Sequence, residues 1–223
     1  MKNDKAIEYW ESMAHDNPNE KTIKVNPQND YTTIDAEFIM QHVDKQSDIL
    51  DLACGTGLTI NKYYDRVGHI DAVEMFPEFS QFIVKTPKVT VHNEDIMEFS
   101  TDKSYDLILM FGIVQYFNSE EVTYLYDKYK DNLKSSGKLL IKNQFGIKDD
   151  VEVSGFSTEI KKEYHSQYRH IDKEVEILKS IGYSVVKIVD IYPVNANRWN
   201  NTHFYAIEAN SISDSYQESE QRK

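Results

Sequence analysis

The sequence lacks several features that define whole classes of proteins. Its single cysteine, Cys54, cannot form an internal disulfide and is too little for a cysteine-based metal site. No run of about 18 apolar residues occurs, and the opening "MKNDKAIEYW" has no apolar segment of the kind found in secretion signals. These absences argue against a disulfide scaffold and against a membrane partner, and they make the cytoplasm the expected location.

Basic residues are also scarce beside acidic ones. The chain of 223 residues contains 25 Lys and Arg against 37 Asp and Glu, which gives a formal net charge of -12. No basic stripe is present that could follow a phosphate backbone, so nucleic acid is not an expected partner. With 40% hydrophobic and 12% aromatic residues, the chain can bury one globular core. We expect a single domain over residues 1–210 and a disordered tail over 211–223.

Short apolar runs alternate with helical patterns from Ser47 onward, which is typical of strand-helix units around a largely parallel sheet. Seven strands are predicted, at residues 48–52, 69–74, 89–92, 105–110, 138–143, 184–191 and 202–209. Helices are predicted within 119–137, with Asn118 or Ser119 as its cap, and within 171–182. The last two strands are joined by too few residues for a crossover helix, so they should pair antiparallel. The expected fold class is therefore α/β, with a doubly wound, mostly parallel seven-stranded sheet and an antiparallel last strand.

Three segments lie outside this alternating pattern. Helices are expected upstream at residues 5–14 and 34–44, with Thr32 and Asp35 at capping spacing for the second. The stretch from Phe145 to about His165 shows no regular period and is interpreted as a long irregular loop.

The run "DLACGTGLTI", residues 51–60, is a glycine-containing turn that suits one of two cofactor classes. A dinucleotide-binding turn needs a third glycine, and Ile60 stands in that place, which argues against a nicotinamide-dependent oxidoreductase. The run fits D-x-x-x-G-x-G instead. In that pattern a strand delivers Asp51, while Gly55 and Gly57 let the backbone turn tightly against a ligand.

This turn and the motifs after it resemble the class I S-adenosylmethionine-dependent methyltransferase family. "AVEMF" closes the second predicted strand, "NEDIMEF" follows the third, and "YDLILMFGIVQYF" contains the fourth. The resemblance covers residues 47–146, in the family's order. It implies a Rossmann-like methyltransferase fold, S-adenosyl-L-methionine as the cofactor, and an N-terminal helical lid over residues 1–45.

The resemblance also implies roles for individual residues. Glu74 stands where the family binds both ribose hydroxyls, and Asp95 where it binds the adenine amine; a one-residue slip would put Asn93 or Glu94 in the latter place. Asp51 either bonds the backbone of its own turn or contacts the cofactor amine. The cofactor-binding residues that the resemblance implies are Tyr9, Tyr31, Asp51, Ala53, Gly55, Gly57, Glu74, Met75, Asp95, Ile96, Met110 and Phe111.

Methyl transfer is a direct displacement, so the enzyme chiefly aligns the reactants and removes a proton where one is held. The sequence lacks the acidic cluster of the metal-dependent relatives and the proline-containing element of relatives that methylate nucleic-acid bases. We therefore expect no metal, and a small-molecule or saccharide acceptor for O- or N-methylation. The alternatives are a non-catalytic S-adenosylmethionine-binding partner or regulatory protein and, less favoured, the oxidoreductase.

Residues after the fifth predicted strand should surround the acceptor. Those expected to bind it are Tyr116, Gln144, Tyr168, Arg169 and Arg198. If the acceptor is a hydroxyl, His165 is the predicted general base. If it is an ionised phosphate or carboxylate, no base is needed, and Arg169 or Arg198 would position it.

Overall fold

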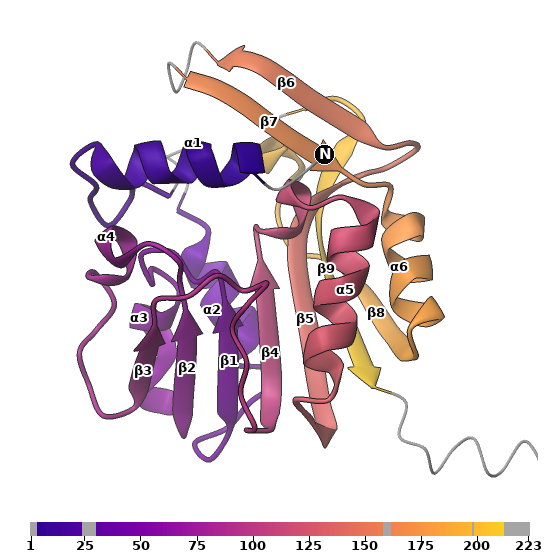
Figure 1. Ribbon diagram of the computed structural model, residues 1–223. Helices are drawn as coiled ribbons and strands as arrows, with labels where there is room; N and C mark the ends of the chain where they lie inside the picture. The colour runs from indigo at the N-terminus through magenta and orange to yellow at the C-terminus, as the bar shows by residue number, and fades with distance from the viewer. Residues whose placement is uncertain (1–3, 24–29, 158–161, 198, 212–223) are drawn as a thin grey trace, which may run out of the picture.

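The computed structural model describes residues 4–23, 30–157, 162–197 and 199–211, and its centre is a seven-stranded sheet of order β3-β2-β1-β4-β5-β9-β8 (Figure 1). The strands are β1 (Asp48–Leu52), β2 (His69–Val73), β3 (Val89–His92), β4 (Tyr105–Phe111), β5 (Leu133–Gly146), β8 (Tyr183–Asp190) and β9 (Thr202–Ser211). Strands β1 to β5 pair in parallel, and β9 runs antiparallel to both of its neighbours, β5 and β8. The predicted fold class, with its antiparallel last strand, is confirmed.

Helices pack around this sheet. They are α1 (Asp4–His15), α2 (Thr32–Ile39), α3 (Ile60–Tyr63), α4 (Pro77–Ser80), α5 (Ser119–Lys130) and α6 (Ile171–Ser180), with 3-10 turns η1 (Tyr64–Arg66), η2 (Val114–Tyr116) and η3 (Val194–Ala196). Figure 1 shows α5 and α6 on one face and α2 and α3 on the other. In the described part of the chain, every helix is too short or too polar to cross a bilayer. Such double winding leaves the carboxyl ends of the parallel strands open to a ligand.

Alternation along the strands divides the core into two layers and decides which side chains reach the upper edge of the sheet. Leu50 of β1 packs in the layer under α5, whereas Ile49 packs in the layer under α2. Asp51, Phe111 and Lys142 have the parity of the α2 layer. They therefore lie on the same face of β1, β4 and β5.

The two predicted helix caps have different outcomes. The Asn118 side chain accepts from the Glu121 N–H at 2.9 Å, and the Glu121 carboxylate accepts from the Asn118 N–H at 2.8 Å, so the predicted Asn118 cap is confirmed. The predicted cap of α2 is wrong. Its Asp35 is buried and pairs with Lys142 instead of with the helix backbone. This helix also ends at Ile39, earlier than expected.

The segment after β5 is not the irregular loop that the sequence suggested. Strand β5 runs on to Gly146, and β6 (Val151–Ser157) and β7 (Lys162–Tyr168) form an antiparallel hairpin beyond it. Figure 1 shows this hairpin together with α1 above the carboxyl ends of the central strands. Among the hairpin residues whose side chains are described, Ser166 and Tyr168 are buried and the others are exposed or half-buried, which explains why no apolar stripe marks the hairpin in the sequence.

Candidate functional site

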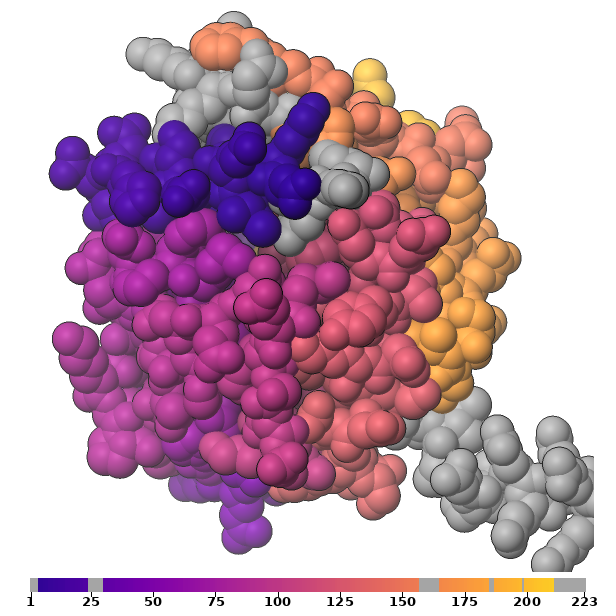
Figure 2. All heavy atoms as spheres, in the orientation of Figure 1, coloured from indigo at the N-terminus to yellow at the C-terminus, as the bar shows by residue number. Residues whose placement is uncertain are grey.

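A cavity of about 350 Å³ lies at the carboxyl ends of the central strands, under α1. This volume falls in the range of small-molecule sites. Figure 2 shows α1 packed closely on the segments below it, without a gap in this view. Of the residues predicted for cofactor or acceptor, those that line the cavity are Tyr31, Asp51, Ala53, Gly55, Glu74, Met75, Asp95, Ile96, Phe111, Tyr116, Gln144 and Tyr168.

The glycine turn after β1 is left-handed at three positions. The φ angles are 58° at Ala53, 60° at Gly55 and 70° at Gly57. A Cβ on Gly55 would lie 2.8 Å from the Cδ1 of Ile23, and one on Gly57 would lie 2.6 Å from the Cγ1 of Ile83. Both glycines are thus required by conformation and by packing. Gly55 lines the cavity, whereas Gly57 does not.

Glu74 follows β2 and is joined to this turn. One carboxylate oxygen accepts from the Gly55 N–H at 2.9 Å, and the other accepts from the Phe76 N–H at 3.0 Å. Burial raises the pKa of Glu74 to about 7, although these two N–H groups act to lower it. The carboxylate is therefore held in one orientation, and each oxygen can accept a further hydrogen bond from a ligand in the cavity.

Asp51, the residue before the last in β1, is a second buried carboxylate of the cavity. It is 6% exposed, and its side chain makes no hydrogen bond with any residue that the structure describes. Burial raises the pKa of Asp51 to about 7, while the nearby ammonium of Lys142 lowers it. A buried polar group without a partner is costly, so this carboxylate is suited to accept from a ligand.

Three polar residues after β3 were candidates for one contact, and the structure separates them. Glu94 and Asp95 line the cavity. Asn93 instead donates to the Ser80 hydroxyl at 2.8 Å and to the Glu74 carbonyl at 3.0 Å. One oxygen of Asp95 accepts from the Met97 N–H at 2.9 Å, which fixes its side chain beside the cavity.

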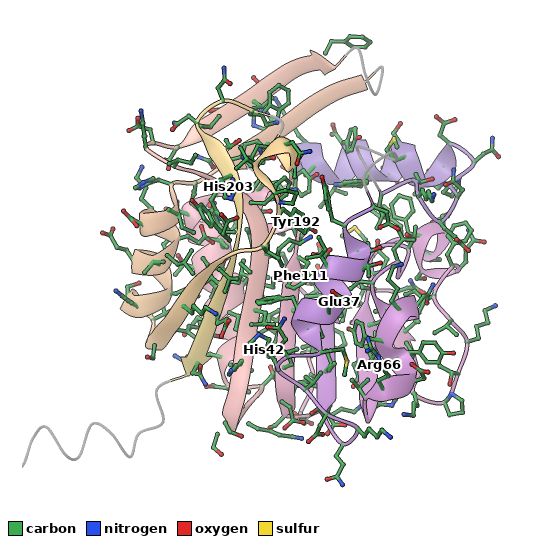
Figure 3. All side chains as sticks on the ribbon, turned by 180° about the vertical axis from the view of Figure 1, so that it is seen from behind. Glu37, His42, Arg66, Phe111, Tyr192 and His203 are labelled. Carbon is green, nitrogen blue, oxygen red and sulfur yellow. The ribbon has the colours of Figure 1, made fainter. Side chains whose placement is uncertain are left out.

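A polar cluster that the sequence did not indicate, made of Lys142, Asp35 and Tyr192, also lines the cavity. The Lys142 ammonium lies 3.1 Å from an Asp35 carboxylate oxygen and 3.0 Å from the Tyr192 hydroxyl, which donates to the other Asp35 oxygen at 2.6 Å. Tyr31 stacks on Tyr192 at 4.6 Å. Figure 3 shows Phe111 and Tyr192 toward the same end of the sheet, and the Lys142 ammonium lies 5.1 and 5.2 Å from their ring centroids. Although burial lowers the pKa of Lys142, the Asp35 carboxylate and Tyr192 hold it above its ordinary value.

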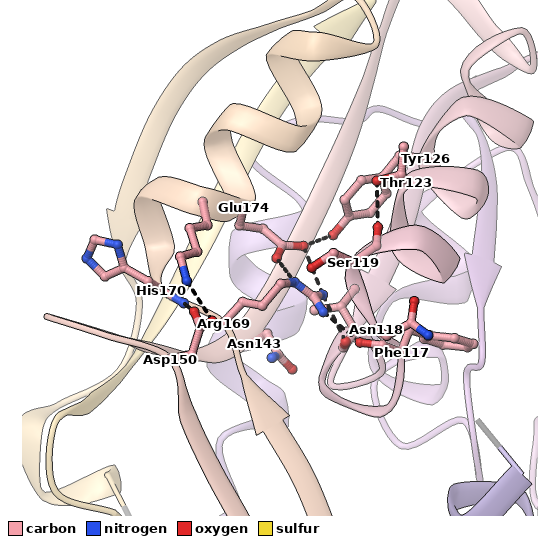
Figure 4. A network of polar contacts seen from close by, with 12 residues as sticks. Phe117, Asn118, Ser119, Thr123, Tyr126, Asn143, Asp150, Arg169, His170 and Glu174 are labelled. Atoms are coloured by element: carbon pink, nitrogen blue, oxygen red, sulfur yellow. Dashed lines mark hydrogen bonds and ion pairs between the residues drawn. The ribbon is translucent and has the colours of Figure 1, made fainter. Parts of the chain in front are cut away.

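Arg169, predicted to bind the acceptor, is buried in a network outside the cavity (Figure 4). Its Nε lies 2.6 Å from a Glu174 carboxylate oxygen, and the Tyr126 hydroxyl donates to the other oxygen. The guanidinium also donates to the Phe117 carbonyl at 2.6 Å and to the Val114 carbonyl at 3.1 Å. Arg169 therefore ties β7 and α6 to η2, which forms one wall of the cavity.

The predicted base is also placed away from the cavity. His165 lies in β7 rather than in a loop, and its Nε2 is 3.6 Å from a Glu152 carboxylate oxygen. Because side chains alternate along a strand, His165 is on the opposite face of the hairpin from Tyr168, which does line the cavity. Arg198 lies outside the described residues.

Two residues predicted for the cofactor point elsewhere. Met110 is fully buried in the layer under α5, on the other face of the sheet from Phe111. Tyr9 does not line the cavity; it packs edge-on against Trp10 at 5.0 Å, and it is Trp10 that faces inward from α1.

Comparison with known families supports the methyltransferase resemblance. Residues 49–137 match the family described as methyltransferase domain, and this range contains the glycine turn, Glu74 and Asp95. Comparison with curated proteins gives no match.

Solved structures with the same fold come from several organisms. The phosphoethanolamine N-methyltransferase 1 of Haemonchus contortus has a TM-score of 0.74 at 14% identity, over 94% of this chain and 49% of that one. The 1,6-didemethyltoxoflavin-N1-methyltransferase of Burkholderia thailandensis has a TM-score of 0.73 at 13% identity, over 93% of this chain and 88% of that one. A methyltransferase of Leishmania major has a TM-score of 0.71 at 16% identity, over 93% of this chain and 82% of that one. At such identities the similarity establishes the fold.

The sheet order, the glycine turn and the acids after successive strands define an α/β protein of the Rossmann-like methyltransferase type. The matching family model adds that residues 49–137 are a methyltransferase domain, consistent with the class I S-adenosylmethionine-dependent type. The resemblance predicted from the sequence is confirmed.

Proposed function

We propose that the protein transfers a methyl group from S-adenosyl-L-methionine to a nitrogen atom of a small molecule. The observation that carries this proposal is that three acids from neighbouring strands line one cavity: Asp51 within β1, Glu74 after β2 and Asp95 after β3. When bound, this cofactor supplies an electrophilic methyl group on a positively charged sulfur.

The hydrogen-bonding groups of the cavity fit the cofactor. An adenine amine, a ribose diol and an ammonium group are all donors, and the cavity presents carboxylate acceptors at Asp95, Glu74 and Asp51 respectively. Apolar side chains such as Ile96 lie beside them and would pack on the adenine ring. The excess of carboxylates also suits a cofactor with a positively charged sulfur.

The other half of the cavity is aromatic and supports a flat acceptor. Its rings belong to Trp10, Tyr31, Phe111, Tyr116, Tyr168, Tyr192 and Phe204, and its amides to Gln115, Asn143 and Gln144. Among the described lining residues, Lys142 is the one Lys, Arg or His, and Asp35 already pairs with it. With five carboxylates against this single cation, a phosphate or carboxylate on the acceptor would be repelled, whereas a neutral or cationic molecule would pack on the rings.

Nitrogen is favoured over a hydroxyl as the methylated atom for a chemical reason. A hydroxyl holds its proton near neutral pH and needs a base, and no histidine lines the described part of the cavity. A ring nitrogen or neutral amine already carries a free electron pair. The two relatives above that are named N-methyltransferases agree with this choice.

We propose that α1, as part of the N-terminal segment, acts as a lid over both halves. Trp10 packs edge-on against Phe79 and against Tyr116, each at 6.0 Å, so it bridges the α4 side of the cavity and the η2 side. In this position α1 excludes water from the reacting groups, which strengthens every charge interaction beneath it.

The test is transfer of a radiolabelled methyl group to a panel of small molecules. The panel holds amines, nitrogen heterocycles, saccharides, and phosphate or carboxylate compounds. Label in the first two classes is expected, and label only in the saccharides or only in the acids contradicts the proposed acceptor. Glu74→Gln should reduce transfer, whereas Glu98→Gln, which changes an exposed acid outside the cavity, should not. Binding of cofactor without transfer to any class would indicate a non-catalytic protein.

A further inference from the structure

Lys142 occupies an unusual position in the charge distribution of the cavity. Five carboxylates line it, those of Asp35, Asp51, Glu74, Glu94 and Asp95. Within the described residues, Lys142 is the one cationic side chain among them. Any anionic group of a ligand would be repelled by the acids unless it lay against this ammonium.

The Lys142 ammonium has a proton left for such a group. A lysine donates three hydrogen bonds, and two are directed at Asp35 and Tyr192. The side chain is 12% exposed and lines the cavity. Its two partners and the adjacent Phe111 ring hold the ammonium in place, so a ligand would meet it without reorganisation.

Lys142 also lies beside the acid that is suited to an ammonium group. Strand β4 lies between β1 and β5. Asp51 of β1 and Lys142 of β5, which is two residues beyond the position in register with Asp51, are both on the face toward α2. The positive charge of Lys142 acts on the Asp51 carboxylate strongly enough to oppose the effect of its burial on the pKa. A carboxylate and an ammonium group therefore lie on strands that flank β4.

We propose that Lys142 binds the carboxylate of the amino-acid end of S-adenosylmethionine, while Asp51 accepts from the ammonium group on the same carbon. This inference rests on the proposed function. An α-amino acid carries both charges on one carbon, and Asp51 and Lys142 offer the complementary charges on the same face of the sheet within one cavity. Asp35 balances the lysine in the ligand-free protein, and its second hydrogen bond, from Tyr192, keeps it in place when the ligand enters.

The test compares S-adenosylmethionine with its decarboxylated form, which differs by that carboxylate alone. Calorimetric titration of the native protein should show tighter binding of the intact cofactor by about tenfold or more, the range of a charge-assisted hydrogen bond. Lys142→Met should remove most of this preference by weakening the intact cofactor selectively. The matched control is Lys134→Met, which removes a lysine paired with Asp48 and Asp106 and lying outside the cavity, and it should keep the preference.

A second variant keeps the test valid if Lys142→Met does not fold. Asp35→Asn combined with Lys142→Met removes both charges of the buried pair and leaves no uncompensated charge. Loss of the preference in either variant supports the inference. A preference that survives in a folded variant, or equal weakening of both ligands, overturns it. If the native protein binds neither ligand, the proposed function itself fails, so the two failures are distinct.

Discussion

Two buried aspartates should respond to pH in opposite ways, and this comparison tests the burial described for the cavity. Burial raises the pKa of Asp51 to about 7. Asp71 of β2 is also buried, but hydrogen bonds from Lys103 at 2.8 Å, His92 at 2.8 Å and Tyr105 at 3.1 Å outweigh that effect and lower its pKa. The matched substitutions are Asp51→Asn and Asp71→Asn.

The sign for Asp51 follows from proton binding. In the unfolded chain its pKa is 3.8, so between about pH 4 and pH 7 the native state holds a proton that the unfolded state has lost. Stability therefore falls as pH rises through this window. At about 1.4 kcal/mol for each pKa unit, the full effect is about 4 kcal/mol, and more than half of it develops between pH 5 and pH 8. Asparagine has no charge to bury. The unfolding free energy of Asp51→Asn should therefore rise relative to that of the native protein as the pH increases over this range.

The sign for Asp71 is the reverse. The ionised form of Asp71 stabilises the protein above the pKa of 3.8 that it has in the unfolded chain. This stabilisation is lost as the pH falls through the lower pKa of the native state. Asp71→Asn should therefore destabilise the protein at neutral pH, with a deficit that shrinks toward acid.

Urea unfolding of the ligand-free proteins at pH 4, 5, 6, 7 and 8, followed by circular dichroism, measures both effects. The difference in unfolding free energy between Asp51→Asn and native should change steadily from pH 5 to pH 8. A difference that stays constant over this range would show that the Asp51 carboxylate is not held in a dry cavity, and would refute the reasoning.

Three further outcomes are expected. Glu74→Gln should weaken S-adenosylhomocysteine binding about tenfold by calorimetry, because an amide replaces one of two acceptor oxygens; unchanged affinity would remove Glu74 from the site. Arg169→Ala should lower the unfolding free energy by about 3 to 5 kcal/mol in urea, because Glu174 stays buried without its partner, whereas Met at both positions should restore most of it. His165→Ala should keep the methyl-transfer rate within about twofold, and a hundredfold loss, the scale of a missing base, would make His165 the catalytic base after all.

Much of the cofactor half was predictable because its residues are adjacent in sequence to strong strand signals. Asp51, Glu74 and Asp95 each come at the end of, or shortly after, an apolar run, and parallel strands bring their carboxyl ends to one edge. Two φ values above zero at Gly55 and Gly57 agree with the need for glycine in the turn. Local pattern was enough in each case.

The cluster around Lys142 was not predictable in this way, because it depends on contacts between distant segments. Asp35 and Lys142 are 107 residues apart, and Asp35 has the spacing of a helix cap. A charged side chain on the α2 face of a buried strand was the signal that could have pointed to Lys142. Its partner and its access to the cavity are set by tertiary packing.

The hairpin misled the prediction for a different reason. Most of its strand residues with described side chains are exposed or half-buried, so neither the alternation nor the face of His165 could be deduced from the sequence. Arg169 and Glu174 are five residues apart with a helix boundary between them, and the sequence did not indicate that both are buried. Because their burial was not indicated, Arg169, which lies in the predicted acceptor segment, was interpreted as a ligand-binding residue.

The central claim is that the cavity under α1 holds S-adenosylmethionine, and calorimetric titration of the native protein with S-adenosylhomocysteine tests it most directly. NADH serves as the comparison ligand. We predict saturable binding of one S-adenosylhomocysteine for each chain, a rise in thermal stability with ligand concentration, and no binding of NADH. Absence of binding at millimolar S-adenosylhomocysteine, or a preference for NADH, would contradict the account.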